Sequence, residues 1–233
     1  KQLNELIHKT FYRADEGIYA TGSQLDMSYP MLVGVVPDAL YDKVKENIIA
    51  ITQQKHKGHI AVGLVGVPIL TAWVTRNKEV DLFYQMLKKR DYPGYLYMID
   101  NGATATWEYW SGERSRVHNC YNGIGTWFYQ AVGGLRLDET APGYRHVFID
   151  PQIPTGVTWA KITKESPYGE IAVRWELKEN RLHLQVSVPA GVTATVCTPR
   201  NAVSCQKNGK KIDMEKEPVM VEAGEFAFEF LLQ

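Results

Sequence analysis

The sequence predicts two successive folded parts, an α-helical part up to about residue 134 and an all-β part after it. The hydrophobic spacing changes from the period of a helix to the two-residue period of a strand. The 233 residues are enough for one large domain or two ordinary ones. We therefore predict one domain at residues 1–134 and a second at residues 135–233.

Helical spacing is clearest in three stretches of the first part. The repeating residues are Leu40, Val44, Ile48 and Ile51, then Val80, Phe83 and Leu87, then Val117, Tyr121, Ile124, Phe128 and Val132. Further helices are expected at residues 2–14, 23–33 and 60–75, with Gly and Pro between them. Asp38 is placed to cap the first stretch. Pairs of helices with short connections predict an array of αα-hairpins.

The expected helix at residues 60–75 is unusually apolar over its first eleven residues, from Ile60 to Leu70. A helix that is apolar on most sides is buried on most sides. Gly63 and Gly66 would let a neighbouring element approach it closely.

The second part alternates apolar and polar residues over 171–177 and again over 182–188, with turn residues at 178–180 between them. This pattern predicts a β-hairpin. Shorter alternating stretches follow, and turn residues separate them; the stretches are 192–196 and 226–230 and the turns 189–191, 208–209 and 223–224. We expect an antiparallel β-sandwich, with Trp159 and Trp175 in its core and a polar linker at residues 136–143 before it.

Composition excludes several classes of function. The chain has 26 basic and 26 acidic residues and no basic run, which argues against a nucleic-acid partner. No apolar run is long enough for membrane insertion. The three cysteines do not form a disulfide framework, and no Cys/His cluster has the spacing of a zinc site. We expect no metal and no cofactor.

The stretch at residues 101–110 carries the strongest chemical signal. It places the carboxylate of Glu108 among Trp107, Tyr109 and Trp110, and His118 follows ten residues later. Aromatic rings stack on the apolar faces of sugars, and a carboxylate can accept or donate a proton. Taken alone, these residues slightly favour a different interpretation, a Trp-rich corner of a hydrophobic core that carries one exposed Glu.

Short motifs across both parts occur in the order and spacing of a known family. They are Gly22–Gln24, Gly102–Glu108, Ser115–His118, Gly123–Trp127, Gly134–Arg136, Ala141–Tyr144 and Ser166–Gly169. The chain resembles the C-terminal part of bacterial α-L-rhamnosidases of glycoside hydrolase family 78. The resemblance implies the second half of an (α/α)6 catalytic barrel, followed by a C-terminal β-sandwich.

The resemblance also implies roles for individual residues. Glu108 falls on the general base that activates water in an inverting hydrolysis, and His118 on a histidine that contacts the rhamnose. Given the match, we name three further candidates for substrate binding. They are Trp110 as a stacking platform, Tyr95 beside Tyr97 at the rim of the pocket, and Gln24 within it. Each also has a structural interpretation, as a core ring or a bridge between helices.

The chain departs from the family in two ways. The loop between Trp110 and His118 is short, and the upstream segment that carries the general acid is absent. Because hydrolysis needs both carboxyl groups, we expect this fragment alone to be inactive. Its first residue, Lys1, also suggests a piece of something longer. We expect the upstream part of the same polypeptide, or a second copy, to cover the apolar surface of the half-barrel.

The sequence thus predicts part of an enzyme that removes terminal α-L-rhamnose from a glycan or glycoside, in the periplasm or outside the cell. Two other interpretations remain. The chain could be a non-catalytic carbohydrate-binding or scaffold protein on the same fold, or an (α/α)6 glycosidase for another sugar.

Overall fold

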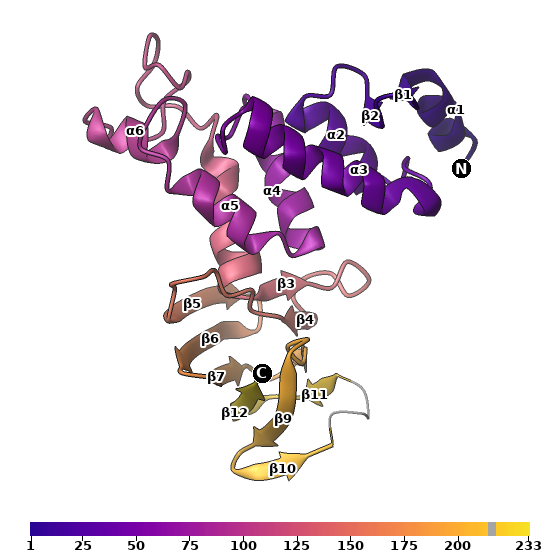
Figure 1. Cartoon of the computed structure of the whole chain (residues 1–233). Helices are drawn as coiled ribbons and strands as arrows, with labels where there is room; N and C mark the ends of the chain where they lie inside the picture. The colour runs from indigo at the N-terminus through magenta and orange to yellow at the C-terminus, as the bar shows by residue number, and fades with distance from the viewer. Residues whose placement is uncertain (214–217) are drawn as a thin grey trace. The chain divides into compact units, whose positions relative to one another are not determined.

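The computed structural model describes residues 1–213 and 218–233. Contacts divide the chain into two compact units, which we call the helical unit (residues 1–127) and the sheet unit (residues 128–233). The predicted fold class is confirmed, since helical hairpins come first and largely antiparallel sheets follow (Figure 1). The domain boundary expected between residues 134 and 135 stays a prediction. In the described part of the chain no helix has the length and apolar character needed to cross a membrane.

The helical unit consists of helices joined by short loops. They are α1 (Gln2–Phe11), α2 (Gln24–Leu32), α3 (Asp38–Ala50) with its π-helical extension η1 (Ile51–Lys55), α4 (Gly66–Asn77), α5 (Val80–Leu87), α6 (Tyr95–Asp100), η2 (Asn122–Ile124) and α7 (Gly125–Trp127). A two-residue hairpin of β1 (Tyr12–Arg13) and β2 (Ile18–Tyr19) follows α1. Helix α2 packs against both α3 and α4, and α4 also packs against α5 and α7 (Figure 1).

The contact between α2 and α4 forms the centre of the helical unit. Met27 and Met31 of α2 are buried, and so is Trp73 of α4. The indole N–H of Trp73 points at the Met31 sulfur, 3.1 Å away. Ser23 caps the start of α2, because its hydroxyl accepts a hydrogen bond from the Asp26 N–H. The sequence therefore specifies both where α2 begins and which face it buries.

Helix α4 begins later than predicted. Residues 59–63 form no helix, and α4 starts at Gly66. Pro68 favours this later start, because proline has no N–H to donate and is best accommodated in the first turn of a helix. A Cβ on Gly66 would lie 2.5 Å from the Cβ of Val62, so this glycine allows the preceding chain to fold back on the helix. Gly63, in contrast, has open space around it.

Three other local predictions for the helical unit are wrong. The helix predicted from Val117 onward does not begin there, since residues 117–121 are not helical. Val117 is 77% exposed, so it does not belong to the buried face that the helical spacing implied. Asp38 is the first residue of α3, and Pro37 occupies the capping position without a side-chain hydrogen bond. Helix α1 ends at Phe11 because residues 12–13 pair with β2 instead of continuing the helix.

The sheet unit begins with the π-helical turn η3 (Phe128–Val132) and continues as two sheets. Its strands are β3 (Leu135–Leu137), β4 (His146–Ile149), β5 (Trp159–Ser166), β6 (Gly169–Lys178), β7 (Arg181–Val188), β8 (Thr193–Val196), β9 (Ala202–Lys207), β10 (Lys210–Ile212), β11 (Val219–Val221) and β12 (Gly224–Leu232). One sheet has the order β10-β9-β12-β7-β6-β5 and the other β11-β8-β4-β3. The single parallel pair among these ladders, β4 with β8, makes the smaller sheet mixed rather than fully antiparallel.

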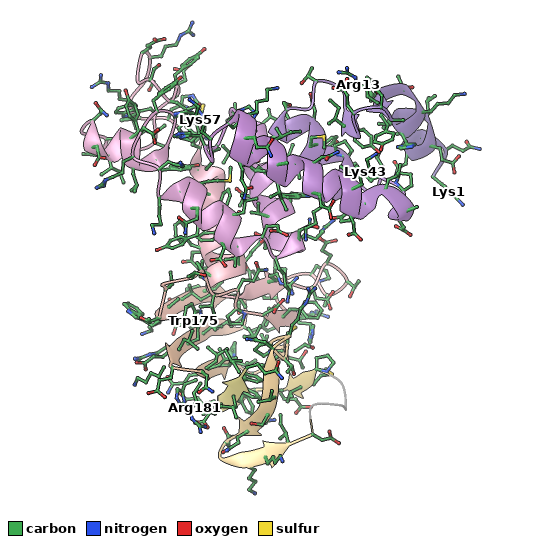
Figure 2. All side chains as sticks on the ribbon, viewed as in Figure 1. Lys1, Arg13, Lys43, Lys57, Trp175 and Arg181 are labelled. Carbon is green, nitrogen blue, oxygen red and sulfur yellow. The ribbon has the colours of Figure 1, made fainter. Side chains whose placement is uncertain are left out.

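Alternation along β6 and β7 builds the core of the sheet unit. Val173 lies opposite Val186 and Trp175 opposite Leu184, and all four side chains are buried. Trp175, labelled in Figure 2, lies on β6 of the larger sheet. Its indole N–H donates to the carbonyl of Val132 at 2.7 Å, which ties η3 to this sheet. The predicted hairpin at residues 178–180 is confirmed, since Lys178 pairs with Arg181.

Two predictions for the sheet unit are wrong. Trp159 is 64% exposed, because Ala160 is the residue that lies opposite Trp175 and its neighbour Trp159 must face the other side. The predicted linker at residues 136–143 begins inside a strand. Arg136 pairs with Phe148 in the β3–β4 ladder, and its guanidinium contacts the buried carboxylate of Asp150 at 2.8 Å.

These two tryptophans provide a matched test of the strand register. Trp175→Phe should lower the free energy of unfolding by about 1–3 kcal/mol, because it removes a buried hydrogen bond and part of a core side chain. Trp159→Phe, on the exposed face, should change it by less than about 0.5 kcal/mol. Urea unfolding followed by circular dichroism measures both. Equal destabilisation by the two variants would contradict the register described above.

Candidate active site

The residues that the sequence singled out lie in a loop that closes on itself, which we call the carboxylate loop (residues 106–118). The Glu108 N–H donates to the Ser115 carbonyl and the His118 N–H to the Thr106 carbonyl, each at 2.8 Å. The Thr106 hydroxyl also donates to the His118 carbonyl. These bonds bring the two ends of the loop together, so Glu108 and His118 occupy its two facing arms.

The loop folds around the ring of Trp107. This side chain is buried, and the Arg116 guanidinium lies 5.2 Å from the centre of its ring. Gly112 turns the chain with a φ of +74°, and a Cβ there would lie 2.8 Å from the Trp107 ring carbons. Only glycine combines that backbone angle with so close an approach. Trp107 therefore shapes the loop.

The Glu108 carboxylate is held by donors but still reaches solvent. Its side chain is 28% exposed. Oε2 accepts from the Ser115 N–H at 3.3 Å, and Oε1 lies 3.9 Å from Nη1 of Arg114. A carboxylate that is oriented by donors and still accessible to water has the properties that a general base requires.

Hydrogen bonding selects one neutral form of the His118 ring. Nδ1 accepts a hydrogen bond from the Cys120 N–H at 3.1 Å. A ring nitrogen that accepts carries no proton in neutral imidazole, so the proton lies on Nε2. The half-buried His118 side chain can then donate a hydrogen bond through Nε2, as recognition of a sugar hydroxyl would need.

Trp110 lies in the core of the helical unit. Its ring is 9% exposed and stacks on Tyr121, with ring centres 3.9 Å apart. Its indole N–H donates to the Val62 carbonyl at 3.0 Å. Protein therefore covers most of the ring, and the proposed sugar-stacking role of Trp110 stays a prediction.

Tyr95 anchors α6 to the segment after the carboxylate loop. Its hydroxyl donates to the Tyr121 carbonyl at 2.7 Å, and its ring meets the Trp110 ring edge to face. Burial, with a smaller effect from Tyr121, raises the pKa of the Tyr95 hydroxyl, so this group stays protonated at neutral pH. Its position at the rim of a pocket stays a prediction, and so does that of Tyr97, whose ring packs edge-on against Tyr92.

Gln24 is buried and serves as a bridge instead of lining a pocket. Its side-chain amide donates to the Thr52 hydroxyl at 3.1 Å and to the His59 carbonyl at 3.0 Å. Its carbonyl oxygen accepts from the Ala61 N–H at 2.8 Å. Because Gln24 is fully buried and both ends of its amide are occupied, it cannot touch a substrate in this conformation. The predicted substrate contact is therefore replaced by a structural role.

The sequence did not single out Arg114, although it contacts Glu108. The guanidinium also lies 5.3 Å from the centre of the Tyr109 ring. Six residues would separate the two side chains by about 9 Å along a helix and about 20 Å along a strand, so only the folded loop brings Arg114 to the carboxylate. Among residues 1–213 and 218–233, no group of three or more His, Cys, Asp or Glu side chains is arranged to hold a metal ion.

Family models match nearly the whole chain up to residue 213. The bacterial α-L-rhamnosidase six-hairpin glycosidase domain matches residues 1–132. The bacterial α-L-rhamnosidase C-terminal domain matches residues 134–213. The two models thus follow the same order as the helical and sheet units.

Individual relatives are similar over the whole chain but much longer than it. An α-L-rhamnosidase of Formosa agariphila is 30% identical over 97% of this chain and 27% of its own length. The structure of a Streptomyces avermitilis α-L-rhamnosidase complexed with L-rhamnose is 26% identical, with a TM-score of 0.86 over 98% of this chain and 23% of its own. An α-L-rhamnosidase from Dictyoglumus thermophilum has a TM-score of 0.89 at 22% identity, over 99% of this chain and 28% of its own, which shows the fold. The chain spans about a quarter of the length of the first curated relatives it matches.

The bridging role of Gln24 can be tested against an exposed glutamine. Gln24→Met should lower the free energy of unfolding by about 2–4 kcal/mol, because it leaves buried donors and acceptors of three residues without partners. Gln54→Met, at an exposed position of η1, should leave stability within about 0.5 kcal/mol. Thermal and urea unfolding give both values. A stable Gln24→Met protein would show that the bridge is dispensable.

Proposed function

This chain belongs to the bacterial α-L-rhamnosidase family, and from that premise we propose that its protein is an inverting glycoside hydrolase. The proposed reaction removes terminal α-L-rhamnose from a glycan or glycoside. The observation that carries the proposal is the carboxylate loop, which presents an oriented and accessible Glu108 beside His118. The named activity of the relatives supports the same sugar.

We assign Glu108 as the general base. In an inverting hydrolysis a carboxylate removes a proton from a water molecule, which attacks the anomeric carbon from the face opposite the leaving group. The Ser115 N–H and the Arg114 guanidinium both face the Glu108 carboxylate. Donors in these positions orient the carboxylate, which must be ionised to accept the proton.

We place the general acid outside residues 1–233. Inverting glycosidases need a second carboxyl group about 6.5–9.5 Å from the base, with the attacking water between them. This chain spans about a quarter of the length of its curated relatives, which supports a general acid in a further part of the polypeptide. Under this proposal the chain alone holds one half of the catalytic pair and does not turn over substrate.

His118 is proposed to hold the rhamnose. Its Nε2–H is the free donor of the ring, because Nδ1 is occupied by the Cys120 N–H. A donor fixed in one direction can select a sugar with a hydroxyl or ring oxygen at that position. His118 would then contribute to binding, while Glu108 acts on the water.

The surface of α1 supports the proposed partners. No residue of α1 is buried, and Leu3 and Leu6 are 66% and 61% exposed. Apolar side chains this exposed on one short helix are typical of a surface that another protein segment covers. We propose that another part of the same polypeptide, or a second copy, packs there. A periplasmic or extracellular location also remains a proposal.

Glu108→Gln in the longest natural polypeptide that carries this sequence tests the assigned base. The amide can still accept the Ser115 N–H but cannot take a proton from water. We expect kcat on p-nitrophenyl α-L-rhamnoside to fall by about 10²–10⁴-fold with little change in KM.

Glu113→Gln is the matched control, since Glu113 is an exposed carboxylate of the same loop. It should leave kcat unchanged. A Glu108→Gln enzyme that keeps its full rate would remove Glu108 from the mechanism. A protein that binds rhamnose but hydrolyses nothing before mutation would favour a carbohydrate-binding role.

The location of the general acid is tested by comparing two polypeptides on the same substrate. We expect the longer polypeptide to hydrolyse p-nitrophenyl α-L-rhamnoside and the chain of residues 1–233 to show no rate above background. Circular dichroism of the shorter chain verifies that it is folded. Turnover by the folded shorter chain would mean that both carboxyl groups lie within it.

A further inference from the structure

The outer face of the six-stranded sheet carries a hollow of about 480 Å³. Its lining includes three small residues on neighbouring strands, Ala172 of β6, Ser187 of β7 and Ala227 of β12. Ala172 and Ser187 lie directly opposite each other, and Ala227 lies opposite Gln185, two residues before Ser187. Large β-branched and aromatic residues are the usual choice on strands. Small residues at these three adjoining positions leave the sheet surface recessed.

Longer side chains form the walls of the hollow. Lys161, Arg174 and Glu225 line it and are all exposed. Asn208, in the turn between β9 and β10, closes one end. Its N–H donates to the Ala227 carbonyl at 2.7 Å, and its side-chain oxygen accepts from the Ala227 N–H at 2.8 Å. The turn is thus fixed at the edge of the recessed floor.

Two cations on the wall lack a neutralising partner. Lys161 and Arg174 lie directly opposite each other on β5 and β6. Like charges in that arrangement destabilise a sheet. Within the described part of the chain neither Lys161 nor Arg174 has an ion pair. Glu176, two residues after Arg174 on β6, is already paired with Lys178 at 3.0 Å. A hollow beside two such cations is suited to an anionic group.

The remaining lining groups suit hydroxyls. Gln185, Ser187 and Asn208 offer amide and hydroxyl groups, and Glu225 offers a carboxylate acceptor. A nucleic-acid site relies on several cations that neutralise phosphates, whereas the lining of this hollow holds two cations and one carboxylate. The two cations lie on one side of the hollow, and amide, hydroxyl and carboxylate groups lie on the other. This combination matches a sugar ring that carries both hydroxyls and one acidic substituent.

We propose that this hollow binds an anionic saccharide, a sugar residue with a carboxylate or a sulfate ester, at a site separate from Glu108. The acidic substituent lies between Lys161 and Arg174, because a guanidinium can bind a carboxylate or sulfate through two parallel hydrogen bonds. The hydroxyls of the ring lie toward Gln185 and Asn208. The site holds a charged part of a glycan without acting on it.

Calorimetric titration of the longest natural polypeptide tests the proposal with three tetrasaccharides of equal length. They are a carboxylated one (tetragalacturonate), a sulfated one and a neutral one (maltotetraose). We expect at least one charged probe to bind about tenfold or more tightly than the neutral probe, with an affinity that falls as salt rises. The tighter of the two charged probes identifies the acidic substituent. Failure of both to bind at millimolar concentration overturns the proposal.

Paired variants separate this site from general charge. Lys161→Gln with Arg174→Gln should weaken binding about tenfold or more. Lys178→Gln removes a cation that is already paired on the same strand and should change affinity less than twofold. If the double variant binds as tightly as the parent, the site lies elsewhere.

A third variant tests the hollow by shape and keeps every charge. Ala227→Leu fills the floor and should abolish binding, while its unfolding midpoint shows that the exposed position tolerates the change. Unchanged binding by a folded Ala227→Leu protein would overturn the proposed location. Glu108→Gln should bind the charged probe normally, so this result does not depend on whether Glu108 is the catalytic base.

Discussion

Closure of the carboxylate loop is the interaction on which the candidate active site depends. Two backbone hydrogen bonds and the enclosed ring of Trp107 fix the loop, and Glu108 takes its position from them. The loop is in turn attached to the helices by the Trp110 indole, which donates to the Val62 carbonyl. Gln24 holds the residues just before Val62 against α2 and η1. These hydrogen bonds, with the short chain segments between them, connect α2 to the carboxylate loop.

This organisation separates residues that hold the site from residues that do chemistry. Trp107, Trp110 and Gln24 are buried, and the polar groups of Trp110 and Gln24 bond to the protein itself. Glu108 and His118 are only partly covered, and each retains a group that can act on a ligand. Rigid support beneath a few exposed groups is the usual arrangement of sites that position a substrate. The aromatic residues of the motif thus act mainly by shaping the loop.

The two faces of the larger sheet are divided in a similar way, since one supports the structure and the other is open to ligands. The inner face of β6 and β7 buries large apolar side chains, which stabilises the sandwich. The outer face contributes little to that core, so small residues such as Ala172 and Ala227 are tolerated there. Exposed positions that stabilise nothing are free to take on binding. The two opposed cations Lys161 and Arg174 weaken the sheet slightly, and a bound anion would offset that cost.

The sequence alone determined what depends on neighbours in the chain. Hydrophobic period set the order of helices and strands, turn residues located the β6–β7 hairpin, and family motifs pointed to Glu108 and His118. Tertiary structure decided the rest, because burial and pairing depend on residues far apart. It turned Trp159 outward through the register with β6, buried Gln24 and brought Arg114 to Glu108. A local pattern records which face of an element is apolar; only the packed chain decides what covers that face and which polar groups remain accessible.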